Sequence, residues 1–389
     1  MYTEKEMAYW LDRIDGLGKK RLQKLREVLG ENTEDTAARL YEMDEAQVRE
    51  LFAECFGENN KDERVIRSVL EAGRLDPAAE YTALIRQGVQ FYIKEDEEYP
   101  PRLRTIPDPP EVLYVAGKLP SPVMPALAVI GARDASPYGR EQAKRFAKEL
   151  SEVGIQIISG MARGVDGIAG RAALPGSGGS FAVLGCGVDI CYPPENRDLY
   201  DALKERGGLI SEYHPGTLPK AGLFPARNRI ISGLSDALLV TEARLRSGTL
   251  ITTDAALEQG REIFAIPGRI SDPFSMGCNE LIRQGAQLAA DPGQIIEFFY
   301  GIHGEVPEEE AALERARSDS IRKSMPREEG VLYELLDANE SRHSEILLPA
   351  LACELRRPVG AGEMKTLLMK LVLKGYAVEE GNGWYRRGK

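Results

Sequence analysis

Short apolar runs alternate with amphipathic stretches through the middle of the chain, from residue 126 to about residue 300. Each run has the length of a strand that is buried on both faces, as in a parallel sheet. Ser136 and Pro137 follow the first run and suit the cap and the first position of a helix. The runs are LAVIGA, IQIISG, FAVLGCG, GLISEY, DALLVTEA and EIFAIPG. Strands separated by helices predict an α/β fold with a doubly wound, mostly parallel sheet.

The first 78 residues show helical periodicity, with Met7, Trp10, Leu11 and Ile14 at helical spacing. The segment IDGLGKKRLQKL follows and resembles a helix-hairpin-helix in a SAM-like helical domain. In that motif the glycine turn lets backbone N–H groups approach a DNA phosphate, and the basic residues 19–21 would help. The same glycines equally suit a small helical interaction module in which they only cap a helix.

The remaining chain divides into three further predicted segments. Residues 79–301 form the sheet domain, which opens with the strand VQFYI and a proline-rich stretch, EYPPRLRTIPDPPEVLYVAG, predicted to be an ordered loop without a helix. Residues 302–325 are polar and predict a linker. Residues 326–389 read as helices followed by a hairpin, which predicts a winged helix. Its charges roughly cancel, so a protein-contact or regulatory role is as compatible as DNA binding.

Composition narrows the class of protein. The formal net charge of −11 argues against a generally basic nucleic-acid protein and leaves room for a local basic groove. Five scattered cysteines without a CxxC pair indicate reduced thiols in a cytoplasmic protein, and a zinc site is not expected. No apolar run is long enough for a membrane span, and the first 20 residues are too charged for a signal peptide. Neither GxGxxG nor GxxxxGK[ST] occurs, so we expect no cofactor at a dinucleotide site or P-loop.

Candidate chemistry gathers between residues 222 and 256. Arg227, Asn228 and Arg229 enter a helix that leads to the apolar run ALLV, and Ser247 and Gly248 follow that strand. In open α/β sheets, ligands bind beyond the carboxyl ends of the strands, where helix N-termini offer free N–H groups. Guanidinium groups suit phosphate. This pattern predicts an anion site, although a single arginine here would more often be a solvated helix charge.

Several motifs together resemble the DprA/Smf family of DNA-processing proteins. They are AVIGARDASPYGRE, ISGMARGVDGIAGRAAL, FAVLGCGVDICYPPENRDLY, FPARNRIISGLSDALLVTEARLRSGTLITTDAALEQGREIFAIPG and GCNELIRQGAQLAADP. The resemblance runs from about Tyr99 to Pro292, half of the chain. It implies a Rossmann-like domain in a protein that is not an enzyme, binds single-stranded DNA, and forms a homodimer through that domain. It also implies that the protein protects incoming DNA and loads the RecA recombinase during natural transformation.

The resemblance also implies a set of DNA-binding residues. The apolar stretch 255–266 could supply part of the dimer surface or could be ordinary core. A groove of cations with an aromatic platform is how single strands are held without base-specific readout. The implied residues are Gly131, Arg133, Arg163, Lys220, Phe224, Arg227, Asn228, Arg229, Ser247 and Gly248.

Two alternative functions remain open. The segment TEARLRSGT also resembles LOG-type phosphoribohydrolases, in which Glu242 would be the acid/base residue. No partner is evident for it, because nothing places His214 nearby. Gly170 stands where many DprA/Smf members have a histidine, and Asp166 is expected to cap or brace a helix. A nucleotide-sensing regulator, with the winged helix as its output, is the other alternative.

Overall fold

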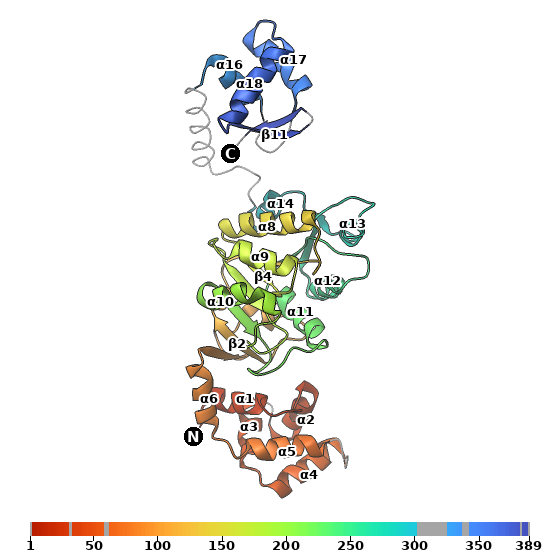
Figure 1. The fold of residues 1–389 in the computed structure, drawn as a ribbon. Coiled ribbons are helices and arrows are strands. Elements are labelled where there is room, and N and C mark those ends of the chain that lie inside the picture. Colours follow the sequence, from red (N-terminus) through yellow and green to blue (C-terminus); the bar gives the residue numbers. More distant parts are fainter. Residues whose placement is uncertain are drawn as a thin grey trace. The chain divides into compact units, whose positions relative to one another are not determined.

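The computed structural model describes residues 2–30, 33–57, 62–301, 325–336, 342–381 and 383–387. They fall in two compact units, Met1–Gly301 and Ile302–Lys389, and each is described by itself (Figure 1). The predicted linker, residues 302–325, lies almost entirely outside the described residues. No described helix is both long enough and apolar enough to span a bilayer.

A nine-stranded sheet forms the centre of the first unit, in the order β1-β2-β6-β5-β4-β3-β7-β8-β9. The seven strands from β6 to β9 in this order run parallel to one another, and β2 pairs antiparallel with both β1 and β6. The predicted α/β fold with a mostly parallel sheet is therefore confirmed. The strands are β1 (Val89–Ile93), β2 (Val112–Gly117), β3 (Ala126–Ile130), β4 (Gln156–Ser159), β5 (Ser180–Val183), β6 (Gly208–Ser211), β7 (Ala237–Val240), β8 (Glu262–Ala265) and β9 (Gln287–Leu288).

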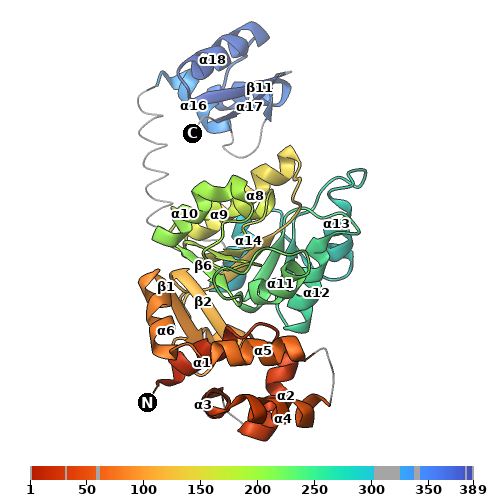
Figure 2. The same cartoon turned by 60° about the horizontal axis from the view of Figure 1, so that its bottom comes forward.

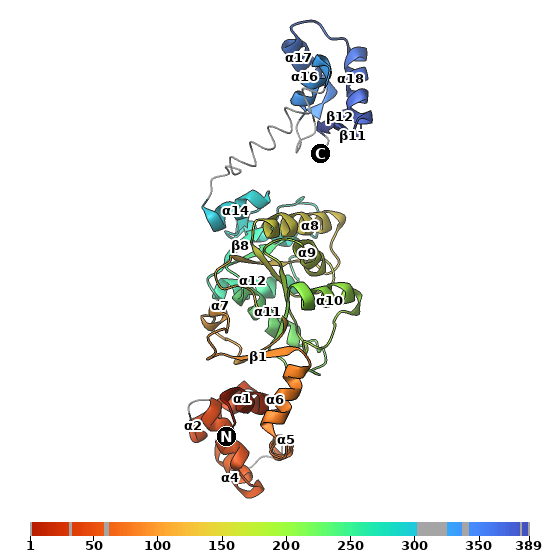
Figure 3. The ribbon, with the colours of Figure 1, turned by 90° about the vertical axis from the view of Figure 1, so that its left-hand side faces the viewer.

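Helices cover both faces of this sheet, because alternate residues of each strand point to opposite sides. In β3, Leu127 and Val129 pack with one helical layer, whereas Ala128 and Ile130 pack with the other. Figure 3 shows α8, α9 and α10 on one side of the strands and α7, α11 and α12 on the other. One layer holds α8 (Pro137–Glu152), α9 (Val165–Ala173), the short 3₁₀ helix η1 (Pro194–Asn196), α10 (Arg197–Arg206) and α14 (Pro292–Tyr300). The other holds α7 (Pro101–Arg104), α11 (Leu223–Gly233), α12 (Gly248–Glu258) and α13 (Met276–Arg283).

The proline-rich stretch before β3 is more regular than the sequence predicts. Pro101 occupies the first turn of α7, where its missing N–H group costs no helical hydrogen bond. The apolar residues 112–117, expected to be loop, form β2 and are almost fully buried between β1 and β6. The prediction of a loop without a helix is therefore wrong, because prolines at a helix start do not oppose the helix.

The described part of residues 2–86 forms six helices, which pack beside the β1–β2 edge of the sheet (Figure 2). Trp10, 2% exposed, donates a hydrogen bond to the Ala72 carbonyl inside this region. The Tyr114 hydroxyl on β2 donates to Asp12 at 2.5 Å, and so ties the helical region to the sheet. The helices are α1 (Glu4–Asp12), α2 (Lys19–Leu29), α3 (Thr33–Glu42), α4 (Glu45–Phe56), α5 (Glu63–Ala72) and α6 (Pro77–Arg86). Because α6 crosses residue 78, the proposed boundary between the first two domains falls inside a helix.

The hairpin between α1 and α2 faces protein groups in this structure. Lys19 pairs with Asp108, and Arg21 pairs with Asp62 at 2.7 Å. Two of the three basic residues expected to help a DNA phosphate are thus already paired with carboxylates. The helix-hairpin-helix reading stays a prediction.

The described residues of the second unit, from residue 325 on, form three helices and a three-stranded antiparallel sheet in the order β10-β12-β11. Buried leucines from the three helices form its core. Glu329, 3% exposed, pairs with Lys374 at 2.6 Å and with Lys370 at 3.7 Å. The elements are α16 (Arg327–Leu335), β10 (Arg342–His343), α17 (Ser344–Leu355), α18 (Ala361–Leu373), β11 (Ala377–Gly381) and β12 (Trp384–Arg387). These elements are compatible with the winged-helix prediction.

Candidate nucleic-acid interface

A cavity of about 720 Å³ opens where the strand order of the sheet reverses. The chain proceeds from β3 outward through β4, β5 and β6, and then returns to place β7 on the other side of β3. Loops that follow β3, β4 and β7 line the cavity, together with α11 and the start of α12. Such a switch point is where open α/β sheets bind their ligands.

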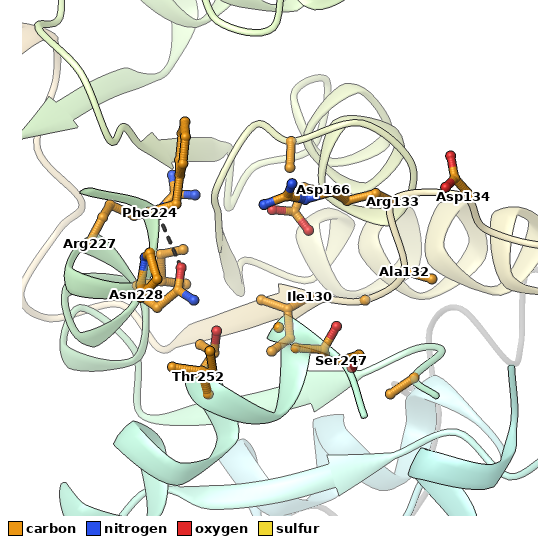
Figure 4. Close-up of a pocket in the computed structure, with 18 of the residues that line it drawn as sticks. Ile130, Ala132, Arg133, Asp134, Asp166, Phe224, Arg227, Asn228, Ser247 and Thr252 are labelled. Atoms are coloured by element: carbon orange, nitrogen blue, oxygen red, sulfur yellow. Dashed lines mark hydrogen bonds between the residues drawn. The ribbon is translucent and has the colours of Figure 1, made fainter. Parts of the chain in front are cut away.

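Most of the residues implied by the resemblance meet at this cavity. Gly131, Arg133, Phe224, Arg227, Asn228, Ser247 and Gly248 line it. Arg163 lines an adjoining cavity of about 210 Å³, which shares Arg133, Phe224 and Arg227 with the first. Lys220 is exposed between Pro219 and Ala221, which both line the larger cavity. Figure 4 shows Arg133 and Asp166 on one side of the cavity, with Phe224, Arg227 and Asn228 on the other.

Arg229 does not join this group. It pairs with Glu212 at 2.6 Å and with Asp108 at 2.9 Å, and it lines a different cavity beside the N-terminal hairpin. Arg227 and Arg229 stand two residues apart on α11, so they point in directions about 200° apart around the helix axis. A helix that turns one of them toward the cavity must turn the other away.

Arg227 reaches the cavity wall as a buried group. It is 5% exposed, and its Nη1 donates to the carbonyls of Gly160, at 3.0 Å, and of Val183. Burial lowers the pKa of Arg227 to about 10, against the opposing attraction of Asp166. The guanidinium therefore stays charged at neutral pH, but two of its donors are committed to the fold.

Asp166 braces the loop that precedes its own helix. Its Oδ2 accepts a hydrogen bond from the Gly160 backbone at 3.1 Å, and burial raises its pKa, opposed by Arg227. A Cβ at Gly160 would meet Asp166 Oδ2 at 2.7 Å and Arg227 Nη2 at 2.8 Å. Asp166 was expected to cap or brace the helix, and the contact found is instead to the loop before it; Gly160 is needed there for the two charged groups to approach.

The N-terminus of α12 opens into the larger cavity without a side-chain cap. Ser247 is in the N-cap position with extended backbone, and its hydroxyl makes no capping hydrogen bond. Its Oγ is buried and has no partner among the described residues. Thr252 is 3% exposed and also lines the cavity. Free N–H groups and hydroxyls at a helix N-terminus form an anion-binding position.

Exposed cations and aromatic rings complete the two cavities. Within the described parts of the chain, Arg133, Arg163 and Lys220 form no ion pair, so their charges are available to a ligand. Tyr192 stacks on Phe224 with ring centroids 5.5 Å apart and planes 28° apart. Tyr192 is 43% exposed and lines both cavities.

Tyr192, Arg244 and Phe274 line the site and were not among the residues that the sequence suggested. The Arg244 guanidinium lies over the Phe274 ring, 4.4 Å from its centroid. Tyr192 sits in the segment after β5, at the carboxyl edge of the sheet, and that position was the available signal. Phe274 precedes α13 and carried no comparable signal.

Glu242, the acid/base residue of the phosphoribohydrolase alternative, faces away from the cavity. It is 1% exposed and accepts hydrogen bonds from the backbone and the hydroxyl of Ser136 at the start of α8. Gly139 makes room for it, since a Cβ there would meet the carboxylate at 2.2 Å. His214 lines the cavity beside the N-terminal hairpin instead. Across the described ranges, no group of three or more His, Cys, Asp or Glu could hold a metal ion.

Comparisons with known proteins agree with this architecture. Protein Smf of Escherichia coli K12 is 47% identical over 211 residues, which are 54% of this chain and 56% of the relative. DNA processing protein DprA of Streptococcus pneumoniae is 42% identical over 204 residues, which are 52% of this chain and 72% of the relative. The X-ray structure of DprA from S. pneumoniae superposes with a TM-score of 0.61 and 33% identity, over 76% of this chain and 97% of that chain. A family model for DNA recombination-mediator protein A matches residues 90–300. The chain therefore belongs to the DNA recombination-mediator protein A family, that of the DprA/Smf DNA-processing proteins.

Proposed function

We propose that this protein binds single-stranded DNA along the two adjoining cavities, which together are called the groove below. The observation that carries the proposal is the combination, at one sheet edge, of stacked aromatic rings and cations that have no ion pair among the described residues. Arg133 and Arg163 stand beside the Tyr192–Phe224 stack, and the open N-terminus of α12 lies at the far wall of the larger cavity. Cations that follow the backbone and rings that stack on bases are the two elements of single-strand binding.

Phosphates are proposed to lie against Arg133, Arg163, Lys220 and the turn of Ser247 and Gly248. One base then stacks on the exposed ring of Tyr192 or on Phe224. Arg227 contributes its positive charge to the groove, but it is not proposed to form a bidentate hydrogen bond to phosphate, since its Nη1 already donates to backbone carbonyls. Arg229 is proposed to act outside the groove, because Glu212 and Asp108 hold it.

Binding rather than catalysis is the proposed activity. The fold already uses Glu242 to hold Ser136, so the phosphoribohydrolase reading lacks an acid/base group at the cavity. Turnover of AMP or ATP that disappears in Glu242→Gln would contradict this proposal. Tight binding of mononucleotides without turnover would instead favour a nucleotide-sensing regulator.

The wider role is proposed from the family. We propose that the protein protects incoming single strands and loads RecA during natural transformation in the cytoplasm, as a homodimer. The stretch 255–266 offers little apolar surface for that dimer, because Ile263, Phe264 and Ile266 are core residues; Leu257 is the large apolar side chain of the stretch that is exposed. Sedimentation at micromolar concentration tests the dimer, and a single monomeric species would count against it.

The direct test compares binding of oligo-dT, duplex DNA and mononucleotides over a range of salt concentrations. We expect oligo-dT to bind best. Arg133→Ala should weaken binding to all sequences alike and flatten the slope of log affinity against log salt by about 0.7. Arg206→Ala is the matched control, since Arg206 is exposed at the end of α10 and lines neither cavity. Unchanged affinity and slope in a folded Arg133→Ala protein would remove this residue from the groove.

The aromatic wall is tested separately. Phe224→Ala should cost about 1–3 kcal/mol of binding free energy, with little change in salt slope, because a stacking contact releases no counterions. A slope that falls as in Arg133→Ala would contradict a stacking role.

A further inference from the structure

The loop between β4 and α9, residues 160–164, carries Arg163 on a constrained backbone. Met161 has φ +54 although it is not glycine, and it is 1% exposed. Gly164 has φ +74, and a Cβ there would meet the Ala132 carbonyl oxygen at 2.2 Å. A non-glycine residue keeps a left-handed conformation only where its surroundings hold it there. The groups that hold this loop therefore decide where the Arg163 guanidinium stands.

Asn196 is the side chain that holds the left-handed part of the loop. Its Nδ2 donates to the Met161 carbonyl at 2.8 Å and to the Ala162 carbonyl at 3.1 Å. Its Oδ1 accepts from Arg171 Nη2 at 3.0 Å, and the side chain is 6% exposed. All its hydrogen-bonding groups are thus turned inward, although it follows the surface segment that bears Tyr192.

The position of Asn196 connects two segments that line the smaller cavity. Arg163 and the segment from Tyr192 to Glu195 both line this cavity. Asn196 is the next residue of that segment, and its amide reaches across to the carbonyls just before Arg163. A shift of this amide changes the position of Arg163 relative to Tyr192.

We infer that Asn196 is a positioning residue for single-stranded DNA, which fixes Arg163 and Tyr192 relative to each other so that one meets a backbone phosphate and the other a base. This inference rests on the proposed function of the groove. Asn196 touches no ligand itself. Asp166 and Arg227 brace the same loop at Gly160, whereas Asn196 restrains Met161 and Ala162.

The test separates the two ends of the Asn196 side chain. Asn196→Asp keeps the acceptor for Arg171 but replaces the two donated hydrogen bonds by a carboxylate oxygen facing carbonyls. Asp198→Asn is the matched control, since it weakens the Arg171 ion pair and leaves the Asn196 donors in place. Gly167→Ala is a second variant without a change of charge, because its Cβ would meet Asn196 Nδ2 at 2.9 Å and both the Ala162 carbonyl and Arg171 Nη1 at 3.1 Å, and so disturb the same hydrogen bonds.

We expect Asn196→Asp to weaken oligo-dT binding about fivefold, within the range for residues that share one network, and Gly167→Ala to act in the same direction. In an Arg163→Ala background the effect of Asn196→Asp should disappear, since the residue acts through Arg163. Asp198→Asn should bind as wild type. Melting temperature and the salt slope are measured for every variant.

Three results would overturn the inference. One is full additivity of Asn196→Asp and Arg163→Ala. Another is a lowered melting temperature with unchanged affinity and slope in folded Asn196→Asp and Gly167→Ala. The third is failure of the wild-type protein to bind oligo-dT, which removes the proposed function as well, whereas the first two leave that function intact.

Discussion

Arg227 combines a position at a binding cavity with the contacts of a buried structural group. Its guanidinium bonds the carbonyls that end β5 and begin the β4–α9 loop, and so links two neighbouring strands beyond their ends. It also faces the buried carboxylate of Asp166, whose pKa it holds down against the effect of burial. The residue thus supports the groove from within the fold.

Removal of this guanidinium should cost stability first. Arg227→Ala leaves two buried carbonyls and the Asp166 charge without their partner, and we expect the free energy of unfolding to fall by about 3 kcal/mol. Urea denaturation measures this loss, and Arg206→Ala should stay within about 0.5 kcal/mol of wild type. Wild-type stability of Arg227→Ala, combined with lost oligo-dT affinity, would show that Arg227 contacts DNA directly.

Among single residues, those that directly follow a predicted strand could be assigned to the site from the sequence. Residues that follow β3 and β7 were predicted to meet at one sheet edge, and Arg133, Ser247 and Gly248 do so. The pattern could not say which arginine of the 227–229 turn faces inward, since that depends on how α11 is rotated against the sheet. Tyr192 was missed because its loop adopts no regular structure from which a direction follows.

The N-terminus of α12 is a position where an added negative charge should affect both stability and DNA binding. Its first N–H groups have no side-chain cap, and Ser247 has the extended backbone of a cap residue. An acidic side chain at this position would accept hydrogen bonds from those N–H groups. It would also place a negative charge where a phosphate is proposed to bind.

Ser247→Asp should therefore change stability and binding in opposite directions. We expect the free energy of unfolding to rise by about 0.5–1 kcal/mol. Oligo-dT affinity should fall at least about fivefold through repulsion between like charges. Denaturation and anisotropy on the same preparation measure both quantities. A rise in both would place the phosphate away from α12.

The contact between α1 and β2 makes the helical region sensitive to pH. Burial raises the pKa of Asp12 to about 6; the Tyr114 hydrogen bond and nearby His214 oppose the shift, and Glu212 adds to it. Between about pH 4 and pH 6 the folded state then binds more protons at Asp12 than the unfolded state does. This group therefore stabilises the fold at the acidic end of that window, and its contribution is lost as the pH rises through 6.

Asp12→Asn should remove that dependence, since an amide accepts the Tyr114 hydrogen bond without titrating. The stability of the variant minus that of wild type should increase by about 2 kcal/mol between pH 4.5 and pH 7.5. Asp15→Asn is the control, because Asp15 is exposed on the same hairpin. A difference that stays constant with pH would mean that Asp12 ionises normally.

Whether a strand could be predicted from the sequence depended on the length of its apolar run and on the residues around it. Six apolar runs of the central region became strands as expected, because each is bounded by glycine or polar residues and followed by a helical pattern. β2 was missed because prolines precede it closely, and β9 because it has two exposed residues and no apolar pattern.

The whole molecule is organised as two compact units, and the candidate groove lies entirely in the first. In the second unit, Lys370 on α18 and Lys374 at its C-cap are paired with the buried Glu329, so these two charges are already committed to the fold. Fold class could be predicted at this scale because strand and helix patterns alternate regularly. The domain boundary predicted at residue 78 falls inside α6, which continues to Arg86.

Deletion of residues 302–389 should leave most of the oligo-dT affinity in place. The groove residues retain all their contacts within residues 1–301, and we expect a change in affinity of less than about threefold. Anisotropy with the shortened protein measures it, and circular dichroism checks that the sheet domain is folded. Abolished binding in a folded shortened protein would place the main DNA contacts in the second unit.

The two tryptophans of this chain are Trp10, which is buried in the N-terminal helical region, and the half-exposed Trp384 on β12. Residues 79–301 contain none, whereas the groove wall carries the exposed Tyr192. Intrinsic fluorescence can therefore distinguish the sheet domain from the flanking regions without a label. Excitation selective for tryptophan reports the flanking regions, and tyrosine emission includes the groove. A titration with single-stranded DNA that quenches tyrosine and leaves tryptophan emission constant would locate the ligand in the sheet domain of the unmodified protein.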